Sequence, residues 1–543
     1  MTDIQPIFIL PEGKSREQGK GAQRTNIAAA RQVADTIRTT LGPLGQDKML
    51  VSGMGDIVIT NDGATILKEM QLEHPTAKMI AEIAKMQEKE TGDGTTTAVV
   101  IAGELLKNAE SLMELNIHPT VIAKGYTMAA EKAVEILEKS AETISMNDKQ
   151  SLTKIAMTAL RGKSAEMGQE AFAKLAVNAV LTVADNGVDK NNIKIVKKAG
   201  SSIEASELIQ GLILDKERMH PDMPRVVKQA KILLTDAAIE IRNTETKGKL
   251  KIRQPGQIQQ FLDQEAAMIR NIVQKIADSG ATALFSQKGV DDSAQQMLAK
   301  KGIYAVRRVM RSDLEALAKA TGGRIITNFN EIEKDDIGYA GSVEGIKIGD
   351  EDMTLVKDCK QAKAVSILLR GATEHVLSEL ERALDDAISV LATVLAEGKI
   401  VAGAGAPEIE TARQLRKFAA SLKGREQLAV MAFADALEVI PTALAENAGL
   451  DAITVLTEVK AAHDKGKKWE GVNVFAGKAM DAWKDGVLEP LKVKTQAISA
   501  AAETAVMILR IDDIIASTRE SGQGMPPSGH GMGMGGMGMP PMM

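Results

Sequence analysis

Gly92-Asp93-Gly94-Thr95-Thr96-Thr97 separates two runs of apolar residues at helical spacing, residues 77–86 and 98–106. The two glycines allow a tight turn, and Thr95 is predicted to cap the second helix. The free N–H groups at the start of a helix suit a phosphate, and Asp93 offers the hard oxygen that Mg²⁺ prefers. The hexapeptide therefore fits both a capped turn between helices and a cradle for a magnesium nucleotide, and these six residues alone do not decide between them.

The composition is that of a globular chain of several domains. The chain has 543 residues, of which 44% are hydrophobic and 26% are charged. Only 2% are aromatic, so aliphatic residues and Met must build the cores, and stacking of nucleic-acid bases on aromatic rings is disfavoured. A net charge of −5 also argues against general nucleic-acid binding.

The cysteine and apolar patterns indicate a cytoplasmic protein. Cys359 is the only cysteine, and the six histidines lie scattered, so the sequence predicts neither a disulfide framework nor a cysteine or histidine metal cage. The apolar run near the N-terminus is too short for a signal peptide. Because no run of about eighteen apolar residues occurs, we expect no membrane span.

The two ends of the chain share one pattern. The first ~145 residues are predicted to be mainly helical, with helices at 25–40, 95–115 and 119–140, and Pro119 suits a first helical position. Residues 408–516 return to long helices. One domain is therefore predicted to be built from both chain ends, with other domains inserted between them.

The middle of the chain has a different rhythm. Residues 148–214 mix helical runs with β-like runs at 193–197 and 207–214, and residues 215–361 alternate in a β-α-β-α-β order that predicts a small parallel sheet. The segment 244–268 interrupts this order with a charged loop and an amphipathic helix. It is either a solvated excursion or a mobile arm that meets another molecule.

Two further segments carry weaker signals. Arg161-Gly162-Lys163-Ser164 ends like a phosphate-binding P-loop, but Met157 occupies the place of its first glycine and a helix precedes it, so we reject that interpretation. The tail 521–543 consists mostly of Gly, Met and Pro with almost no charge, which predicts disorder.

Several separated motifs together resemble one family. They are Leu41-Gly42-Pro43, Asn61-Asp62-Gly63, Gly92 to Thr97, Asp385-Asp386, the loop 403–405, Glu489-Pro490, and residues 425–430 and 440–449. In this order and spacing the chain resembles the group II chaperonins, the archaeal and eukaryotic-cytosolic type that includes the thermosome. The resemblance covers nearly the whole length.

The resemblance implies a chaperonin-like fold that is mainly α in one domain and α/β in the others. A helical equatorial domain comes from both chain ends, and an apical α/β domain with a helical protrusion lies beyond a small intermediate α/β domain. The implied segments are 1–145 and 403–520 (equatorial), 146–214 and 366–402 (intermediate), 215–365 (apical), 244–268 (protrusion) and 521–543 (disordered tail).

The resemblance also implies a site for ATP and Mg²⁺. Asp62 and Asp386 are the expected catalytic residues, which position and activate water, and Asp93 is the expected Mg²⁺ ligand. Lys163, or its neighbour Arg161, is expected to sense the γ-phosphate. The implied nucleotide-binding residues are Leu41, Gly42, Pro43, Gly92, Asp93, Gly94, Thr95, Thr96, Thr97, Lys163, Gly405, Asn473 and Glu489. In the family the loop 403–405 usually has three glycines, so Ala404 is expected to be strained if its φ angle is positive.

The function implied by the resemblance is ATP-dependent protein folding. Hydrolysis is expected to close a built-in lid over the chamber of a double ring made of identical or paralogous subunits. The expected partners are unfolded proteins, with no nucleic acid and no membrane. Two alternatives stay open on the residues alone. A metabolic ATPase or kinase would need neither the 244–268 arm nor the tail, and a purely structural ring protein would not need Asp62, Asp93 and Asp386.

Overall fold

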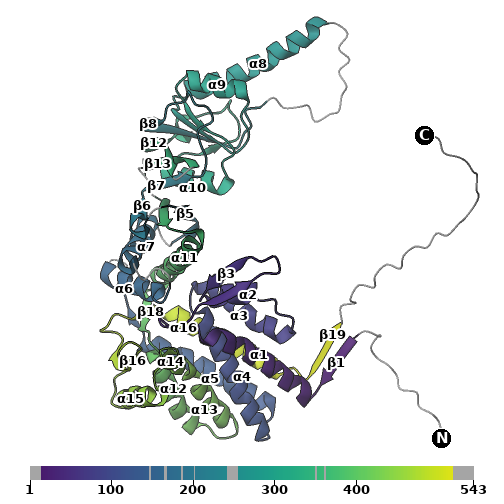
Figure 1. The fold of residues 1–543 in the computed structure, drawn as a ribbon, viewed down its shortest axis with the longest axis vertical. Coiled ribbons are helices and arrows are strands. Elements are labelled where there is room, and N and C mark those ends of the chain that lie inside the picture. Colours follow the sequence, from purple (N-terminus) through teal and green to yellow (C-terminus); the bar gives the residue numbers. More distant parts are fainter. Residues whose placement is uncertain are drawn as a thin grey trace, which may run out of the picture.

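The structure, a computed structural model, describes residues 14–145, 148–163, 168–184, 188–200, 202–240, 255–348, 351–359 and 363–517. The described residues form three bodies stacked along the long axis of the molecule (Figure 1). A helical body contains elements from both ends of the chain, a smaller α/β body follows, and a larger α/β body lies at the far end. The predicted disordered tail at 521–543 lies outside the described residues.

The helical body brings the two ends of the chain together, as predicted. Strand β1 (Lys14–Gln18) pairs antiparallel with β19 (Asp513–Ser517), and β2 and β3 form a hairpin. Its other elements are α1 (Lys20–Arg38), β2 (Lys48–Val51), β3 (Ile57–Thr60), α2 (Gly63–Glu69), α3 (Pro75–Thr91), α4 (Thr95–Glu114), α5 (Pro119–Ser140), α12 (Ala406–Ser421), α13 (Glu426–Leu437), α14 (Val439–Asn447), α15 (Ala452–Asp464), β16 (Glu470–Asn473), β17 (Lys478–Asp481) and α16 (Leu491–Leu509).

Two helices of this body begin with the same local chemistry. In each, a proline at the first helical position follows a histidine whose ring nitrogen accepts a hydrogen bond from the next free N–H group. His74 Nδ1 accepts from the Thr76 N–H at 3.2 Å, and His118 Nδ1 accepts from the Thr120 N–H at 3.3 Å. Proline has no N–H to leave unpaired, so the pair defines a sharp helix start. The prediction for Pro119 is confirmed.

The middle body packs helices against a three-stranded sheet. Strand β14 lies between β5, which it pairs in parallel, and β6, which it pairs antiparallel. Its elements are α6 (Lys149–Leu160), α7 (Gln169–Val183), β5 (Ile193–Ala199), β6 (Glu207–Ile209), β14 (Val365–Gly371) and α11 (Glu374–Glu397). A sheet of β4 (Glu142–Thr143), β15 (Lys399–Ala402) and β18 (Leu488–Pro490) joins this body to the helical one.

The far body contains a seven-stranded mixed sheet, larger than the predicted parallel one. The predicted β-α-β-α-β order is present, because β8, β9, β10 and β11 pair in parallel. The strands that sequence reasoning missed, β12 and β13, form an antiparallel extension. The elements are β7 (Gly211–Leu214), β8 (Val226–Thr235), α8 (Pro255–Asp278), β9 (Ala283–Ser286), α9 (Asp292–Lys300), β10 (Tyr304–Val306), α10 (Arg311–Thr321), β11 (Ile325–Ile326), β12 (Gly338–Ile348) and β13 (Glu351–Cys359).

The central strands of this sheet are apolar on both faces because helices cover both faces. On β8, Ile232 and Leu234 enter one apolar cluster and Leu233 enters the other. The helices α8 and α9 contribute to the second cluster, and α10 contributes to the first. This double burial explains the continuous apolar run in β8, which alternation would not have produced.

One predicted β run crosses between bodies. Residues 207–214 were expected as one element, but β6 pairs with β14 of the middle body and β7 pairs with β13 of the far body. Gln210 separates the two strands, so the chain passes from the middle body to the far body at this residue. The first intermediate segment was predicted to end four residues later, at 214. Both strands are β-like in sequence, and only their partners distinguish them.

One helical stretch within the described part of the chain, Glu426–Asn447, has the length and composition of a membrane span, with a mean hydropathy of 1.7. It comprises α13 and α14, and 67% of its apolar window is buried inside the protein. A helix in the core of a protein can have the same length and apolar composition, and Phe433 and Leu437 of this stretch lie in the core of the helical body.

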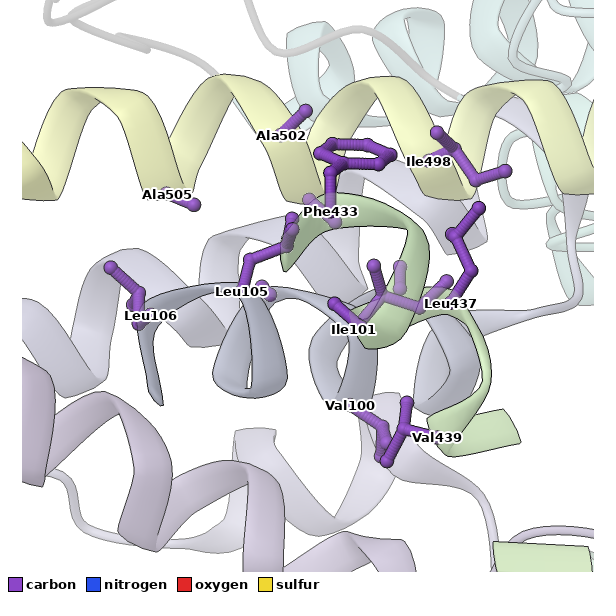
Figure 2. Close-up of a cluster of buried hydrophobic side chains, with 14 of the residues drawn as sticks. Val100, Ile101, Leu105, Leu106, Phe433, Leu437, Val439, Ile498, Ala502 and Ala505 are labelled. Carbon is purple, nitrogen blue, oxygen red and sulfur yellow. The ribbon is translucent and has the colours of Figure 1, made fainter. Parts of the chain in front are cut away.

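The core of the helical body is built around α4, α13 and α16. Figure 2 shows Phe433 of α13 inserted between Leu105 of α4 and the helix α16. Phe433 is fully buried, and its ring meets the Tyr126 ring edge-on with centroids 5.7 Å apart. The remaining contacts are mostly with Ala, Ile and Leu, as the low aromatic content predicted.

Replacing Phe433 by Ala is therefore expected to destabilise the helical body by roughly 3–5 kcal/mol, because a large cavity would remain among residues that cannot collapse into it. Urea titration followed by circular dichroism measures this loss. Leu115→Ala is the control, since Leu115 is 70% exposed and its removal should change stability by less than ~0.5 kcal/mol. Equal unfolding midpoints for the two variants would contradict the packing described here.

Candidate functional site

The connection between α3 and α4 leaves the start of α4 open. Gly92 ends α3 with φ = 71° and Gly94 precedes α4 with φ = 78°, both in the left-handed region that favours glycine. Among the described residues no side chain caps α4. The prediction that Thr95 is the cap is wrong: Thr95 is the first helical residue, and its hydroxyl points elsewhere.

Buried hydrogen bonds hold Asp93 in this connection. The Asp93 carbonyl accepts from Gln87 Nε2 and from Thr91 Oγ1, each at 2.9 Å. The Asp93 carboxylate accepts from the Gly94 N–H at 2.8 Å. Gln87 is fully buried, and its amide also donates to the Val493 carbonyl at the start of α16. Two side chains outside the hexapeptide, Gln87 and Thr91, thus fix the backbone around Asp93.

Asp62 lies beside the start of α4. Its carboxylate caps α2, accepting from the Thr65 N–H at 2.7 Å, and it also accepts from Thr95 Oγ1 at 3.3 Å. The two helix starts approach so closely that a Cβ atom on Gly63 would lie 2.5 Å from Thr96 Oγ1. Two helix N-termini and two carboxylates, Asp62 and Asp93, therefore converge on one place.

Asp386 reaches this place from the middle body through Lys163. Lys163 Nζ forms an ion pair and hydrogen bond with Asp386 Oδ2, and the two side chains are 15% and 20% exposed. Burial raises the pKa of Asp386 to about 7, with Asp62 and Asp93 contributing and Lys163 opposing. Burial disfavours the charged form of Lys163, but Asp386, Asp93 and Asp62 raise its pKa, so the lysine stays protonated.

The loop 41–43 forms one wall and contacts the Lys163 loop. Asn447 of α14 holds it by donating to the Leu41 carbonyl at 2.9 Å. A Cβ on Gly162 would lie 2.7 Å from Pro43 Cα, and Asn61 donates to the Gly162 carbonyl at 2.7 Å. These contacts place the loop that carries Lys163 against the helical body.

The glycine-rich loop 403–405 forms the next wall and contains the expected strain. Ala404 has φ = 57°, so the prediction that this residue is strained at a positive φ is confirmed. Its carbonyl accepts from the Val472 N–H at 2.9 Å, which joins the loop to β16. Gly405, with φ = 77°, precedes α12 and packs against Pro441 at a distance that excludes a side chain.

The last wall comes from β16, β18 and the first turn of α16. Asn473 Oδ1 accepts from the N–H groups of Phe475 and Ala476, which leaves its Nδ2 group for a ligand. Glu489 lies on β18 opposite Val401 of β15. Its carboxylate pairs with Lys494 Nζ at 2.7 Å.

These walls enclose a cavity of about 520 Å³, a size that suits a small-molecule ligand. The structure brings most of the predicted residues to it: Leu41, Gly42, Pro43, Asp62, Asp93, Gly94, Thr95, Thr96, Thr97, Lys163, Gly405, Asn473 and Glu489. Arg161, the alternative to Lys163, lines it as well.

Two predicted residues do not line the cavity. Asp386 lies behind Lys163 and contacts the site through that lysine. Gly92 instead packs against α11, where a Cβ would lie 2.1 Å from Ser389 Cβ. The glycine at this position is required by helix packing, so the part of the hexapeptide that lines the cavity begins at Asp93.

Sequence reasoning missed two groups of residues in this cavity. One is an apolar wall, whose members are Ile440, Leu444, Val472, Val474, Phe475, Met480 and Val487. These residues had no signal because scattered apolar residues are typical of any core. The other is Lys494, which has the position of an ordinary surface lysine in a helix, and only the fold shows it buried at 5% exposure.

The donors in the cavity fit a magnesium nucleotide. Open helix N–H groups, threonine hydroxyls and Lys163 suit phosphates, the apolar wall suits a base, and Asp93 supplies a hard oxygen. No group of three or more His, Cys, Asp or Glu side chains that could hold a metal ion by itself occurs in the described ranges. A Mg²⁺ ion here would therefore share its coordination with phosphate oxygens and water, as this ion commonly does.

Both ends of the chain thus build one helical body with a cavity for a nucleotide, and a residue of the inserted middle body reaches that cavity. This combination defines the class of nucleotide-driven chaperonin subunits. The chain belongs to the TCP-1/cpn60 chaperonin family, whose model matches residues 33–519. Its relatives and the solved structures place it in group II, so it is an ATP-dependent protein-folding chaperonin.

The similar proteins cover nearly the whole chain. A thermosome subunit beta of Methanothermobacter thermautotrophicus is 56% identical over 541 residues, 99% of each chain. A thermosome subunit beta of Archaeoglobus fulgidus is 55% identical over 538 residues, 98% of each chain. Among solved structures, the open-state monomer of a group II chaperonin from Methanococcoides burtonii is 47% identical, with a TM-score of 0.58 over 77% of this chain and 100% of that chain.

The strain at Ala404 generates a prediction. Relief of the left-handed conformation in Ala404→Gly should be worth about 1–2 kcal/mol, offset by roughly 0.5–1 kcal/mol of backbone entropy. We therefore expect a slightly higher thermal midpoint, measured by calorimetry, with unchanged ATP affinity. Ala412→Gly, in the interior of α12, is the matched control and should lose about 1 kcal/mol or more. A lower midpoint for Ala404→Gly would show that the loop is not strained.

Proposed function

We propose that the cavity binds ATP with Mg²⁺ and hydrolyses ATP, and that hydrolysis closes the far body over a captured protein. The observation that carries this proposal is the contact between Lys163 and Asp386, because Asp386 belongs to α11 of the middle body while its partner lines the cavity. A change in the ligand at the cavity can thus alter a contact that reaches the inserted bodies.

The arrangement of chemical groups supports one orientation of the nucleotide. The phosphates would lie at the open start of α4, where Thr95, Thr96 and Thr97 offer hydroxyls and Asp93 would hold Mg²⁺. When bound, Mg²⁺ supplies positive charge that offsets the charge of the phosphates. The base would lie against the apolar wall near Asn473 and Phe475. Glu489 would then accept hydrogen bonds from the sugar hydroxyls, since a carboxylate beside the phosphates would repel them.

Two carboxylates are suited to position the attacking water. Asp62 is fixed by its capping hydrogen bonds to α2, so its oxygens cannot turn away from the start of α4. In Asp386, Oδ2 is held by Lys163, which leaves Oδ1 to accept a proton from water. A pKa of about 7 suits a group that takes up and releases a proton near neutral pH. Phosphoryl transfer depends mostly on positioning and charge, so these groups are chemically sufficient.

The proposal includes assembly and location. Relatives named thermosome subunit alpha and thermosome subunit beta occur in one organism, Archaeoglobus fulgidus, which supports assembly of this chain with identical or paralogous subunits in stacked rings. The clients would be unfolded or partly folded proteins inside the cytoplasm. The 244–268 segment would act as the lid, and its described part, the start of α8, extends beyond the sheet of the far body (Figure 1).

The first test is Asp386→Ala. We expect the variant to bind ATP normally and to hydrolyse it about a hundredfold more slowly or worse, because the water loses its positioning carboxylate while the cavity wall is unchanged. Calorimetry measures binding, and release of phosphate measures turnover.

The adjacent residue provides a matched control. Asp385 lies on the exposed side of the same turn of α11, so Asp385→Ala should retain wild-type turnover. Wild-type turnover in Asp386→Ala, or an equal loss in both variants, would overturn the role assigned to Asp386.

The second test removes the proposed lid. Deletion of 244–268 leaves the buried part of α8 in place, because Ile269, Val273 and Ile276 are each 3% exposed or less. ATP hydrolysis should persist, while a captured substrate should become sensitive to protease in the presence of ATP. If the shortened protein still protected its substrate, the lid would have to be another segment.

A further inference from the structure

A buried chain of three charged side chains begins at the cavity wall, which Glu489 and Lys494 both line, and ends at Glu408 in the interior. Lys494 Nζ is 2.7 Å from Glu489 Oε2 and 2.9 Å from Glu408 Oε1. The side chains of Lys494 and Glu408 are 7% and 2% exposed, and that of Glu489 is 21% exposed. Glu408 is the one of the three that does not line the cavity. One lysine, contributed by α16, thus joins a residue of the cavity wall to a carboxylate in the interior.

Hydrophobic packing does not explain why a lysine is buried at this position. Burying a charge is costly unless it is paired, and here two carboxylates surround one cation. Glu408 Oε2 is buried and has no hydrogen-bond partner among the described residues, so the interior end of the chain is not fully satisfied. Both carboxylates stabilise the buried cation, and the one at the cavity end, Glu489, is the one that a ligand can reach.

The charges in the chain act on Glu489. Burial raises the pKa of Glu489, Glu408 raises it further, and Lys494 opposes both. Burial disfavours the charged form of Lys494, but the two carboxylates raise its pKa, so the lysine remains a cation. Without Lys494, nothing in the chain would oppose burial and the charge of Glu408, so the protonated form of Glu489 would be favoured.

The backbone fixes the direction of the Glu489 carboxylate as well. Oε2 is held by Lys494, and Oε1 lies against Gly403, where a Cβ atom would be only 2.4 Å away. The pairing of Glu489 with Val401 fixes the backbone on which the side chain stands. The carboxylate is therefore held at Oε2 by the ion pair, while Oε1 occupies space that a side chain at residue 403 would fill.

We propose that Lys494, supported by Glu408, is a positioning residue that keeps Glu489 ionised and aimed at the sugar hydroxyls of the bound nucleotide, so that it sets the selectivity of the site for ribose over deoxyribose. The inference rests on the proposed function of the cavity. A carboxylate accepts hydrogen bonds from neighbouring hydroxyls, and a protonated or rotated carboxyl loses that strength.

The test compares nucleotides in the full-length protein. In the wild type, 2′-deoxy-ATP or 3′-deoxy-ATP should bind about tenfold to a hundredfold more weakly than ATP, measured by calorimetry. In Lys494→Met, ATP should weaken to the level of the deoxynucleotides, and KM should rise while kcat changes little. The surface variant Lys174→Met is the control, because Lys174 pairs with Glu170 on an exposed face of α7 and should retain full selectivity.

A second variant keeps the test valid if Lys494→Met does not fold, since that change leaves Glu408 buried without a cation. The double variant Glu408→Gln, Lys494→Met removes both charges and should show the same loss of ribose selectivity. Adding Glu489→Gln to this double variant should have little further effect on ATP affinity, because residues that act as one unit are not additive.

The outcomes separate the two proposals. If the wild type binds no ATP, the proposed function fails. If the wild type binds ATP and distinguishes it from the deoxynucleotides, but the variants of Lys494 distinguish them equally well, the role of Lys494 is overturned while the proposed function stands. If the loss of Glu489 and the loss of Lys494 add independently, Lys494 does not act through Glu489.

Discussion

The structure depends on a helix that starts without a cap. Gly94 has no side chain to offer, and the hydroxyl of Thr95 is turned to Asp62, so the first N–H groups of α4 are left for a ligand. The partial positive charge at such a helix start favours an anion. Every neighbouring element can be understood as a wall around that position, and each wall comes from a distant part of the chain. Both chain ends must therefore fold into one body before this helix start is surrounded.

The same connection also joins the helical body to the middle body. The left-handed turn at Gly92 allows the side chain of Ser389 on α11 to approach at a distance that any Cβ would block. One turn away, Asp386 pairs with Lys163, whose loop rests on Pro43. The α11 helix thus meets the site at two points, one by packing and one by charge. The packing contact at Gly92 ties α11 directly to the helical body, whereas the ion pair joins two segments of the middle body and reaches the cavity through Lys163.

The sequence predicted the fold where strong local patterns existed. The helices near 95–115 and 119–140 and the alternating strands of the far body are confirmed within a few residues, because periodicity, prolines and glycines determine them locally. The antiparallel extension by β12 and β13 was missed, and the run 207–214 was not divided, because a strand does not specify its partner. In the cavity, residues in motifs were predicted and residues from scattered positions were not. Gln87, Asn447 and Lys494 act through hydrogen bonds and ion pairs to residues far away in the sequence. Such contacts cannot be predicted from residue spacing.

The first turn of α16 shows what the motifs alone could not. The Val493 carbonyl accepts from Gln87, whose amide also holds the carbonyl of Asp93, while the next residue, Lys494, holds Glu489. One helical turn from the C-terminal part of the chain therefore supports both the end of the cavity suited to phosphates and the end suited to a sugar. The distance between those two ends is then set by two buried side chains, Gln87 and Lys494, which meet or leave the same turn of backbone. Such a support favours selectivity for a whole nucleotide. Because the two ends of the cavity cannot move independently, a ligand that fits only one end gains no contacts at the other.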